Sequence, residues 1–157
     1  WPLRSGWPLG SGWPVESLIF SPESLNSGRG ARLVAAASGR GIKTVLVETN
    51  IIEALAYTEA PQGILALCRM RSPRLEEIAV QKDVMPGKGA LVVVMDGVSD
   101  PGNLGTIIRS AHAFGADGAV LMRGTVDLYN DKALRSTMGS VFYLPAAQNV
   151  SPAELRE

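Results

Sequence analysis

The sequence has little of what would place it in several common classes of protein. Its 157 residues include a single cysteine, Cys68, so no disulfide can form within the chain, and this fits a reducing compartment. Basic and acidic residues balance at 15 each, and a formal net charge of zero argues against a strongly basic, non-specific nucleic-acid binder. No apolar run approaches transmembrane length, and no signal-peptide pattern is present. We therefore expect a soluble protein of the cytoplasm.

Composition along the chain predicts a leader and two α/β domains. Residues 1–14 contain Trp-Pro pairs separated by Gly and Ser, a low-complexity pattern that favours a poorly ordered leader over a Trp-rich arm that stacks on bases. Residues 15–81 alternate short strands and helices and form the first domain. Residues 82–89 read as a linker ending in Pro-Gly-Lys-Gly, and residues 90–157 form the second domain.

The second domain carries the clearest structural pattern. Leu91–Met95 is a short apolar run followed by turn-forming residues, which predicts a strand buried on both faces. Apolar residues at helical spacing follow, and Ala119–Met122 then predicts a second strand, parallel to the first. A third strand is predicted at Ser140–Leu144. The helical stripe consists of Leu104, Ile107, Ile108, Ala111 and Phe114.

Three further residues of the predicted helix lie outside that stripe or interrupt it. Asn103 stands where the loop becomes a helix and could cap its first N–H groups, and Gly105 would let a backbone or a ligand come close. Arg109 points away from the apolar stripe. One interpretation is a cap, a packing glycine and a solvated arginine; the other is a ligand site beyond the carboxyl end of a strand. The spacing alone leaves both open.

A family resemblance favours the second interpretation. Asp100–Ala111 contains a complete N-x-G-x-x-x-R-x-A core and resembles the first motif of the SpoU/TrmH branch of the SPOUT RNA methyltransferases. The pattern continues through Val126–Tyr129 and Arg135–Pro145, and Pro61–Ala66 resembles part of the small domain that precedes the enzyme domain in that family. The resemblance implies a small α/β/α substrate-binding domain, then a partial SPOUT domain: Rossmann-like, with a parallel sheet that is normally trefoil-knotted.

The resemblance also implies an activity and the residues that perform it. We expect 2′-O-ribose methylation of RNA, ribosomal rather than transfer RNA, with S-adenosylmethionine as the methyl donor and a homodimer as the assembly. Arg109 would steady the developing alkoxide and a nearby phosphate, and Asn103 would orient that arginine or the ribose. The residues expected to hold RNA phosphates are Arg69, Arg71, Arg74 and Arg135; for the first three, a solvated strand end is the alternative.

The cofactor part of the family pattern is not found in this sequence. Neither the glycine- and glutamate-containing loop nor the Ser-Leu-Asn run that builds the S-adenosylmethionine pocket follows Pro145. We therefore expect no cofactor-binding residues, no metal site and an incomplete form of such an enzyme. The competing hypothesis is a non-catalytic module that binds RNA or dimerises. A generic nucleotide-binding domain lacks support, since Gly97–Gly105 is neither G-x-G-x-x-G nor a phosphate loop.

Overall fold

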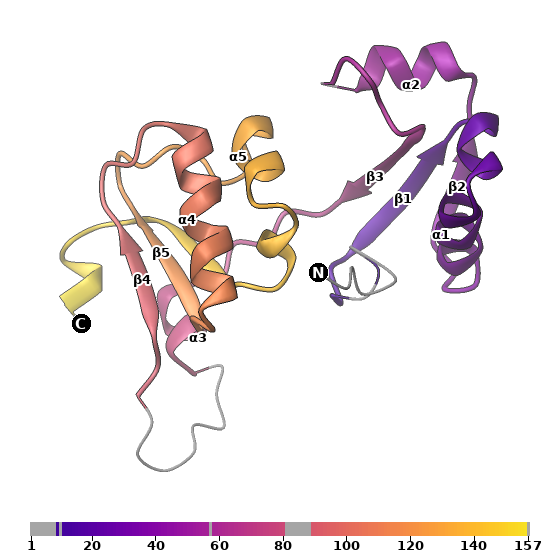
Figure 1. The fold of residues 1–157 in the computed structure, drawn as a ribbon. Helices are drawn as coiled ribbons and strands as arrows, with labels where there is room; N and C mark the ends of the chain where they lie inside the picture. Colours follow the sequence, from indigo (N-terminus) through magenta and orange to yellow (C-terminus); the bar gives the residue numbers. More distant parts are fainter. Residues whose placement is uncertain (1–8, 10, 57, 81–88, 157) are drawn as a thin grey trace. The chain divides into compact units, whose positions relative to one another are not determined.

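Two compact α/β units make up the chain. The computed structural model describes residues 9, 11–56, 58–80 and 89–156, and it divides the chain into Trp1–Arg69 and Met70–Glu157. Each unit contains one three-stranded sheet with helices beside it (Figure 1). The predicted α/β class is thus confirmed.

The first unit is built on a mixed sheet in the order β2-β1-β3. β1 pairs in parallel with β2 and antiparallel with β3. A 3-10 turn, η1, follows β1 directly. Ser27 then caps α1, because its side-chain oxygen accepts a hydrogen bond from the N–H of Gly30 at 2.9 Å. The elements are β1 (Val15–Phe20), η1 (Pro22–Asn26), α1 (Gly28–Ser38), β2 (Lys43–Leu46), α2 (Thr49–Leu55) and β3 (Ile64–Cys68).

The core of this unit begins before the first strand. Leu9 is only 7% exposed and packs with Leu18 of β1 and Ala37 of α1. Its carbonyl oxygen accepts a hydrogen bond from the guanidinium of Arg40. Part of the segment that we expected to be a leader therefore belongs to the packed unit, because an apolar residue there covers the α1 face of the sheet. Residues 1–8 and 10 of that expected leader lie outside the described residues.

The second unit has a fully parallel sheet in the order β4-β5-β6, as the resemblance implied for this region. α4 lies along β4 and β5, and α5 lies beside α4 (Figure 1). β5 is buried along its whole length. The elements are α3 (Leu75–Val80), β4 (Val92–Met95), α4 (Pro101–Ala113), β5 (Gly118–Met122), α5 (Asp131–Ser136), the 3-10 turn η2 (Ser140–Phe142), β6 (Ala146–Val150) and a last 3-10 turn, η3 (Glu154–Arg156).

α3 belongs to this second unit, although we expected residues up to 81 to belong to the first. Ile78 of α3 is 2% exposed and packs with Val120 and Met122 of β5 and Val150 of β6. Gly118 leaves room for it, since a Cβ there would lie 2.2 Å from Ile78 Cγ2. Side chains alternate between the faces of a strand, so α3 and α4 cover opposite faces of the sheet. The linker expected at 82–89 lies almost wholly outside the described residues.

The third strand of this sheet is not where the sequence predicted it. Ser140–Leu144 was expected as the strand, but Ser140–Phe142 form η2 and the strand runs from Ala146 to Val150. The cause is the turn at Met138 and Gly139, both in the left-handed region with φ of 49° and 89°. It closes i→i+3 bonds such as Phe142 N–H to the Gly139 carbonyl at 3.1 Å, so the apolar run that follows cannot extend.

Candidate functional site

The site is organised around α4, which begins two residues earlier than predicted. Asp100 is the N-cap, because its carboxylate oxygen Oδ1 accepts the N–H of Asn103 at 2.8 Å. Pro101 occupies the first helical position, where its fixed φ suits the helix and its missing N–H costs nothing. The prediction that Asn103 caps the helix was therefore wrong. Its side chain is left available for another role.

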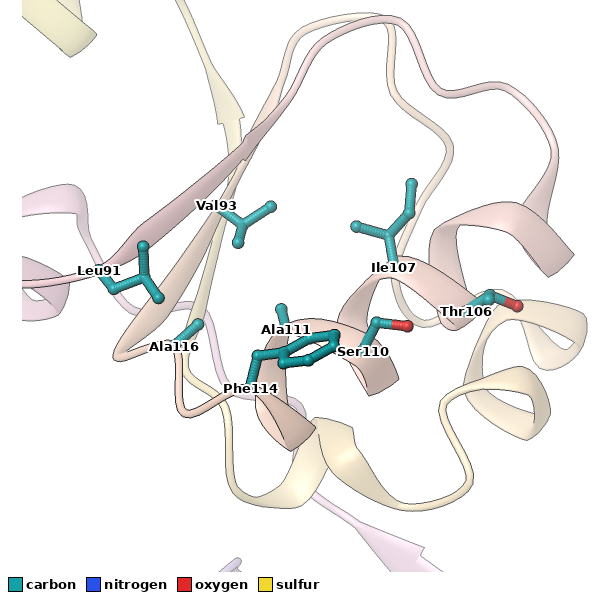
Figure 2. Close-up of a pocket in the computed structure, with 8 residues that line it drawn as sticks. All are labelled: Leu91, Val93, Thr106, Ile107, Ser110, Ala111, Phe114 and Ala116. Carbon is teal, nitrogen blue, oxygen red and sulfur yellow. The ribbon is translucent and has the colours of Figure 1, made fainter.

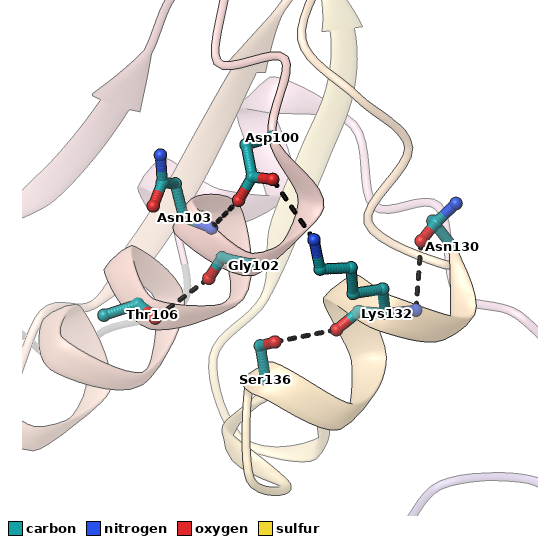
Figure 3. Close-up of polar contacts among 7 residues, drawn as sticks. All are labelled: Asp100, Gly102, Asn103, Thr106, Asn130, Lys132 and Ser136. Carbon is teal, nitrogen blue, oxygen red and sulfur yellow. Dashed lines mark hydrogen bonds and ion pairs between the residues drawn. The ribbon is translucent and has the colours of Figure 1, made fainter. Parts of the chain in front are cut away.

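Asp100 also links α4 to α5. Lys132 Nζ of α5 lies 3.3 Å from Asp100 Oδ2 (Figure 3). The hydrogen bond from the Asn103 N–H and then the one from Lys132 hold the pKa of Asp100 below its ordinary value, so this carboxylate stays ionised at the positive end of the helix. Asn130 caps α5 in the same way by accepting the N–H of Lys132 at 3.0 Å.

Gly105 is the point where the two helices meet. A Cβ at this position would lie 2.4 Å from Ser136 Cβ and 2.5 Å from the carbonyl oxygen of Ala133, both in α5. Of the two possibilities for this glycine, the one that applies is the approach of another backbone. Gly105 thus fixes the spacing of α4 and α5, which pack against each other.

Asn103 and Arg109 both lie on the outside of this helix. Leu104, Gly105 and Ile108 between them are buried, which leaves the two polar side chains exposed. Among the described residues, neither side chain forms a hydrogen bond or an ion pair. Six residues of α-helix separate them by about 9 Å along the axis. They are not in contact with each other, and each would meet a different part of a ligand.

A groove of about 310 Å³ lies on another side of α4. Figure 2 shows Leu91 and Val93 of the β4 segment facing the α4 side chains across it. Its lining is apolar except for two hydroxyl groups, and Phe114 at its edge is 86% exposed. The lining residues are Leu91, Val93, Thr106, Ile107, Ser110, Ala111, Phe114 and Ala116.

This groove does not fit S-adenosylmethionine. The amino-acid end of that molecule carries a carboxylate and an ammonium, and burying charged groups without charged or polar partners is unfavourable. The groove offers only the hydroxyls of Thr106 and Ser110, and that of Thr106 already donates to the Gly102 carbonyl at 2.9 Å. The described residues that line the groove therefore offer no charged partner for either end of the cofactor's amino-acid group.

The four arginines expected to bind RNA are all exposed. Arg69 directly follows β3 in the first unit and pairs with Glu16 at 2.9 Å. The other three lie in the second unit. Arg74 precedes α3 and pairs with Glu77 at 3.3 Å, while Arg135 lies on α5, the helix packed against α4. Exposed pairs of this kind are worth little and exchange readily for a phosphate.

Tyr129 ends one run of the family pattern, but the sequence assigned no role to its side chain. Its hydroxyl accepts the backbone N–H of Arg71 at 3.1 Å and donates to the carbonyl oxygen of the same residue. Burial, and then the charge of Asp127, raises the pKa of Tyr129, so the phenol keeps the proton that it donates. The two partners are 58 residues apart, and no local pattern reveals such a contact.

Metal-binding clusters and membrane-spanning helices are both absent from the described part of the chain. No group of three or more His, Cys, Asp or Glu side chains there is arranged to hold a metal ion. No helix within the same residues is long and apolar enough to cross a bilayer.

Both units match known families. Residues 90–157 match the SpoU rRNA Methylase family, and residues 9–74 match the family described as RNA 2′-O ribose methyltransferase substrate binding. The two matched regions follow one another as the two units do. The chain belongs to the SpoU methylase family.

Individual relatives agree with this assignment. The 23S rRNA (guanosine(2553)-2′-O)-methyltransferase RlmP of Bacillus subtilis is 38% identical over 117 residues, which are 74% of this chain and 43% of that protein. The SpoU methyltransferase AviRb of Streptomyces viridochromogenes, solved with AdoMet, matches with a TM-score of 0.75 at 31% identity, over 94% of this chain and 51% of that one. An AdoMet-bound rRNA methyltransferase of Sinorhizobium meliloti matches with a TM-score of 0.73 at 30% identity, again over 94% of this chain and 51% of that one. The chain thus spans about half the length of these relatives.

Proposed function

We propose that this protein methylates a ribose 2′-hydroxyl of ribosomal RNA, with S-adenosylmethionine as the methyl donor. The observation that carries the proposal is the pair of exposed side chains, Asn103 and Arg109, on a helix that is capped at Asp100 and held against α5 at Gly105. Rigid placement of groups that have no partner of their own is what a binding or catalytic site requires.

Arg109 would act on the ribose. A 2′-hydroxyl is a weak nucleophile at neutral pH. Its oxygen gains negative charge as it attacks the methyl group, and this charge needs stabilisation. A guanidinium keeps its proton in proteins and can donate two parallel hydrogen bonds to oxygen atoms. Arg109 would therefore stabilise the developing alkoxide and hold an adjacent phosphate rather than remove the proton itself. S-adenosylmethionine would supply the methyl group.

Asn103 would orient the nucleotide. Its amide group can donate and accept hydrogen bonds, which suits a ribose hydroxyl, and it lies about 9 Å along the helix from Arg109. The first unit would bind flanking RNA, as the name of its matching family suggests, with Arg69, Arg71, Arg74 and Arg135 as candidate phosphate contacts. Names of the relatives support ribosomal over transfer RNA.

The substitution Arg109→Ala tests the catalytic role in a version of the protein that also carries the cofactor part of the family pattern. Loss of one preorganised donor to a developing oxyanion lowers rates by about 100-fold or more, so methyl transfer from radiolabelled S-adenosylmethionine to a 23S rRNA transcript should be nearly abolished. The matched control is Arg123→Ala, an exposed arginine of the same unit whose side chain pairs with Glu154 at 3.6 Å. Equal activity in wild type and Arg109→Ala would refute the assignment.

A second candidate, an RNA-binding or dimerising module without catalysis, is favoured by the poor fit of the α4 groove to S-adenosylmethionine. Calorimetric titration of S-adenosylmethionine into the chain separates the two. Saturable binding at micromolar concentrations supports the enzyme, whereas RNA binding without cofactor binding supports the module.

The family resemblance also supports a homodimer, and light scattering coupled to size-exclusion chromatography would measure its mass.

A further inference from the structure

The segment Met70–Arg74 carries the chain from the first unit to the second, and it is held at both ends. At one end, the Tyr129 hydroxyl bonds both the N–H and the carbonyl of Arg71. At the other, Leu75 and Ile78 of α3 pack into the core of the second unit, and the Glu77 N–H donates to the Arg74 carbonyl at 3.1 Å. The two arginines therefore lie between two fixed points of one rigid unit.

Tyr129 itself belongs to a loop with little freedom. Its N–H donates to Asp127 Oδ1 at 3.0 Å, and the N–H of the buried Leu128 donates to Gln148 Oε1 at 2.8 Å. Asn130, the next residue, is the cap of α5. Because α5 packs on α4 at Gly105, a short series of contacts joins the Arg71 backbone to the helix that carries Arg109.

A two-sided backbone clamp of this kind is more than packing requires. The ring alone would fill its space, and a tyrosine hydroxyl that both donates and accepts fixes where the backbone of one particular residue lies. That residue and its neighbour three positions on are both exposed arginines. An exposed guanidinium on a fixed backbone loses less entropy when it meets a phosphate than one on a free segment.

We propose that Tyr129 is a positioning residue for RNA: it holds the backbone of Arg71 so that Arg71 and Arg74 meet phosphates beside the ribose on which Arg109 acts. The inference rests on the proposed function, because it takes RNA as the substrate. The inference gives a role to Tyr129, which does not contact RNA itself and acts through Arg71 and Arg74.

The test uses the full 157-residue chain and four variants, one of which combines two of the single substitutions. Tyr129→Phe keeps the ring and removes both hydrogen bonds, whereas Arg71→Ala keeps the backbone groups and removes the charge. Tyr143→Phe is the matched control, because its hydroxyl has no hydrogen bond with another described residue. Binding to a 23S rRNA transcript is measured by filter retention over a range of salt concentrations, with transfer RNA as competitor.

Arg71→Ala should weaken binding roughly tenfold, as loss of a charge-assisted bond does. It should also lower the slope of log affinity against log salt by about 0.7 to 0.9, which is the loss of one phosphate contact. Tyr129→Phe should reproduce part of both effects while its melting temperature stays close to that of wild type. The double variant should bind no worse than Arg71→Ala alone, because the two residues act through one contact.

The outcomes separate this inference from the proposed function. Wild-type affinity and salt slope in Tyr129→Phe, or in Arg71→Ala, would overturn the positioning role even if methyl transfer is observed. RNA binding by the wild type without methyl transfer would favour the non-catalytic module and leave the binding comparison as the deciding test of Tyr129. A loss of affinity in Tyr143→Phe equal to that in Tyr129→Phe would also count against the inference.

Discussion

Gly105→Ala should destabilise the second unit, although alanine is the better helix former. The new Cβ would lie 2.4 Å from Ser136 Cβ and 2.5 Å from the Ala133 carbonyl oxygen, where unstrained carbon contacts are about 3.5 to 4.0 Å. The oxygen belongs to the backbone, so no change of rotamer removes that overlap. α4 and α5 would have to separate by about 1 Å, which uncovers the buried Ala133, Leu104 and Ile108.

The size of the effect follows from two opposing contributions. Overpacking of a rigid contact costs about 3 kcal/mol at the upper end of its usual range. Replacing glycine by alanine inside a helix stabilises the folded state by about 1 kcal/mol. The net loss of about 2 kcal/mol corresponds to a melting temperature lower by roughly 10 °C for a unit of this size.

The assay has to observe the second unit itself. All three tryptophans precede residue 14, so tryptophan fluorescence reports on the other end of the chain. Urea denaturation followed by far-ultraviolet circular dichroism, with hydrogen exchange measured on α4 peptides, avoids this difficulty. The control is Gly28→Ala at the start of α1, where the nearest atom, Arg32 Nη1, is 3.6 Å from the new Cβ and no loss is expected. If Gly105→Ala is as stable as wild type, the close approach of the two helices is refuted.

Two further predictions concern packing and pH. Gly118→Ala should destabilise the sheet because its Cβ would lie 2.2 Å from Ile78 Cγ2. The loss that it causes should be smaller in an Ile78→Ala background, which removes Cγ2, than in the wild-type background, as chemical denaturation of a double-mutant cycle would measure. Asp100→Ala should destabilise the protein at pH 7, where the carboxylate caps α4. Because its folded pKa lies below the ordinary 3.8, the stabilisation exists above that value and is lost as the pH falls through the folded pKa; the difference in melting temperature should therefore shrink as the pH falls below 3.8, and a constant difference would contradict it.

The sequence predicted those parts of the fold that depend on local pattern. The apolar runs at β4 and β5 and the stripe of α4 were recognised because burial imposes a period on the chain. The third strand was misplaced because Val141, Phe142 and Leu144 form an apolar run as well, and the left-handed turn before it is not apparent from composition. The start of α4 was misplaced because two cap formers three residues apart, Asp100 and Asn103, compete, and Pro101 favours Asp100 because proline suits the first helical position.

The site was predictable only where it coincides with one helix. Asn103 and Arg109 became candidates because they belong to the N-x-G-x-x-x-R-x-A core of the family motif, and their spacing on α4 left their role open. The bond from Lys132 to Asp100 spans 32 residues, and that from Tyr129 to Arg71 spans 58. Each depends on how α5 and the loop before it fold back on the unit. Polar contacts of this kind leave no periodic pattern in the sequence, because each involves only one pair of residues.

The residues of the α4 motif divide into those that the fold requires and those that it does not. Gly105 is required by the approach of α5, and Leu104, Ile108 and Ala111 are required by the core, because each is buried. Asn103 and Arg109 stabilise nothing within the described residues of this unit. Substitution of such exposed side chains typically changes the free energy of unfolding by about 0.5 kcal/mol or less. Arg109→Ala should therefore melt like the wild type while losing methyl transfer, and a large loss of stability would show that the fold, rather than a ligand, accounts for this arginine.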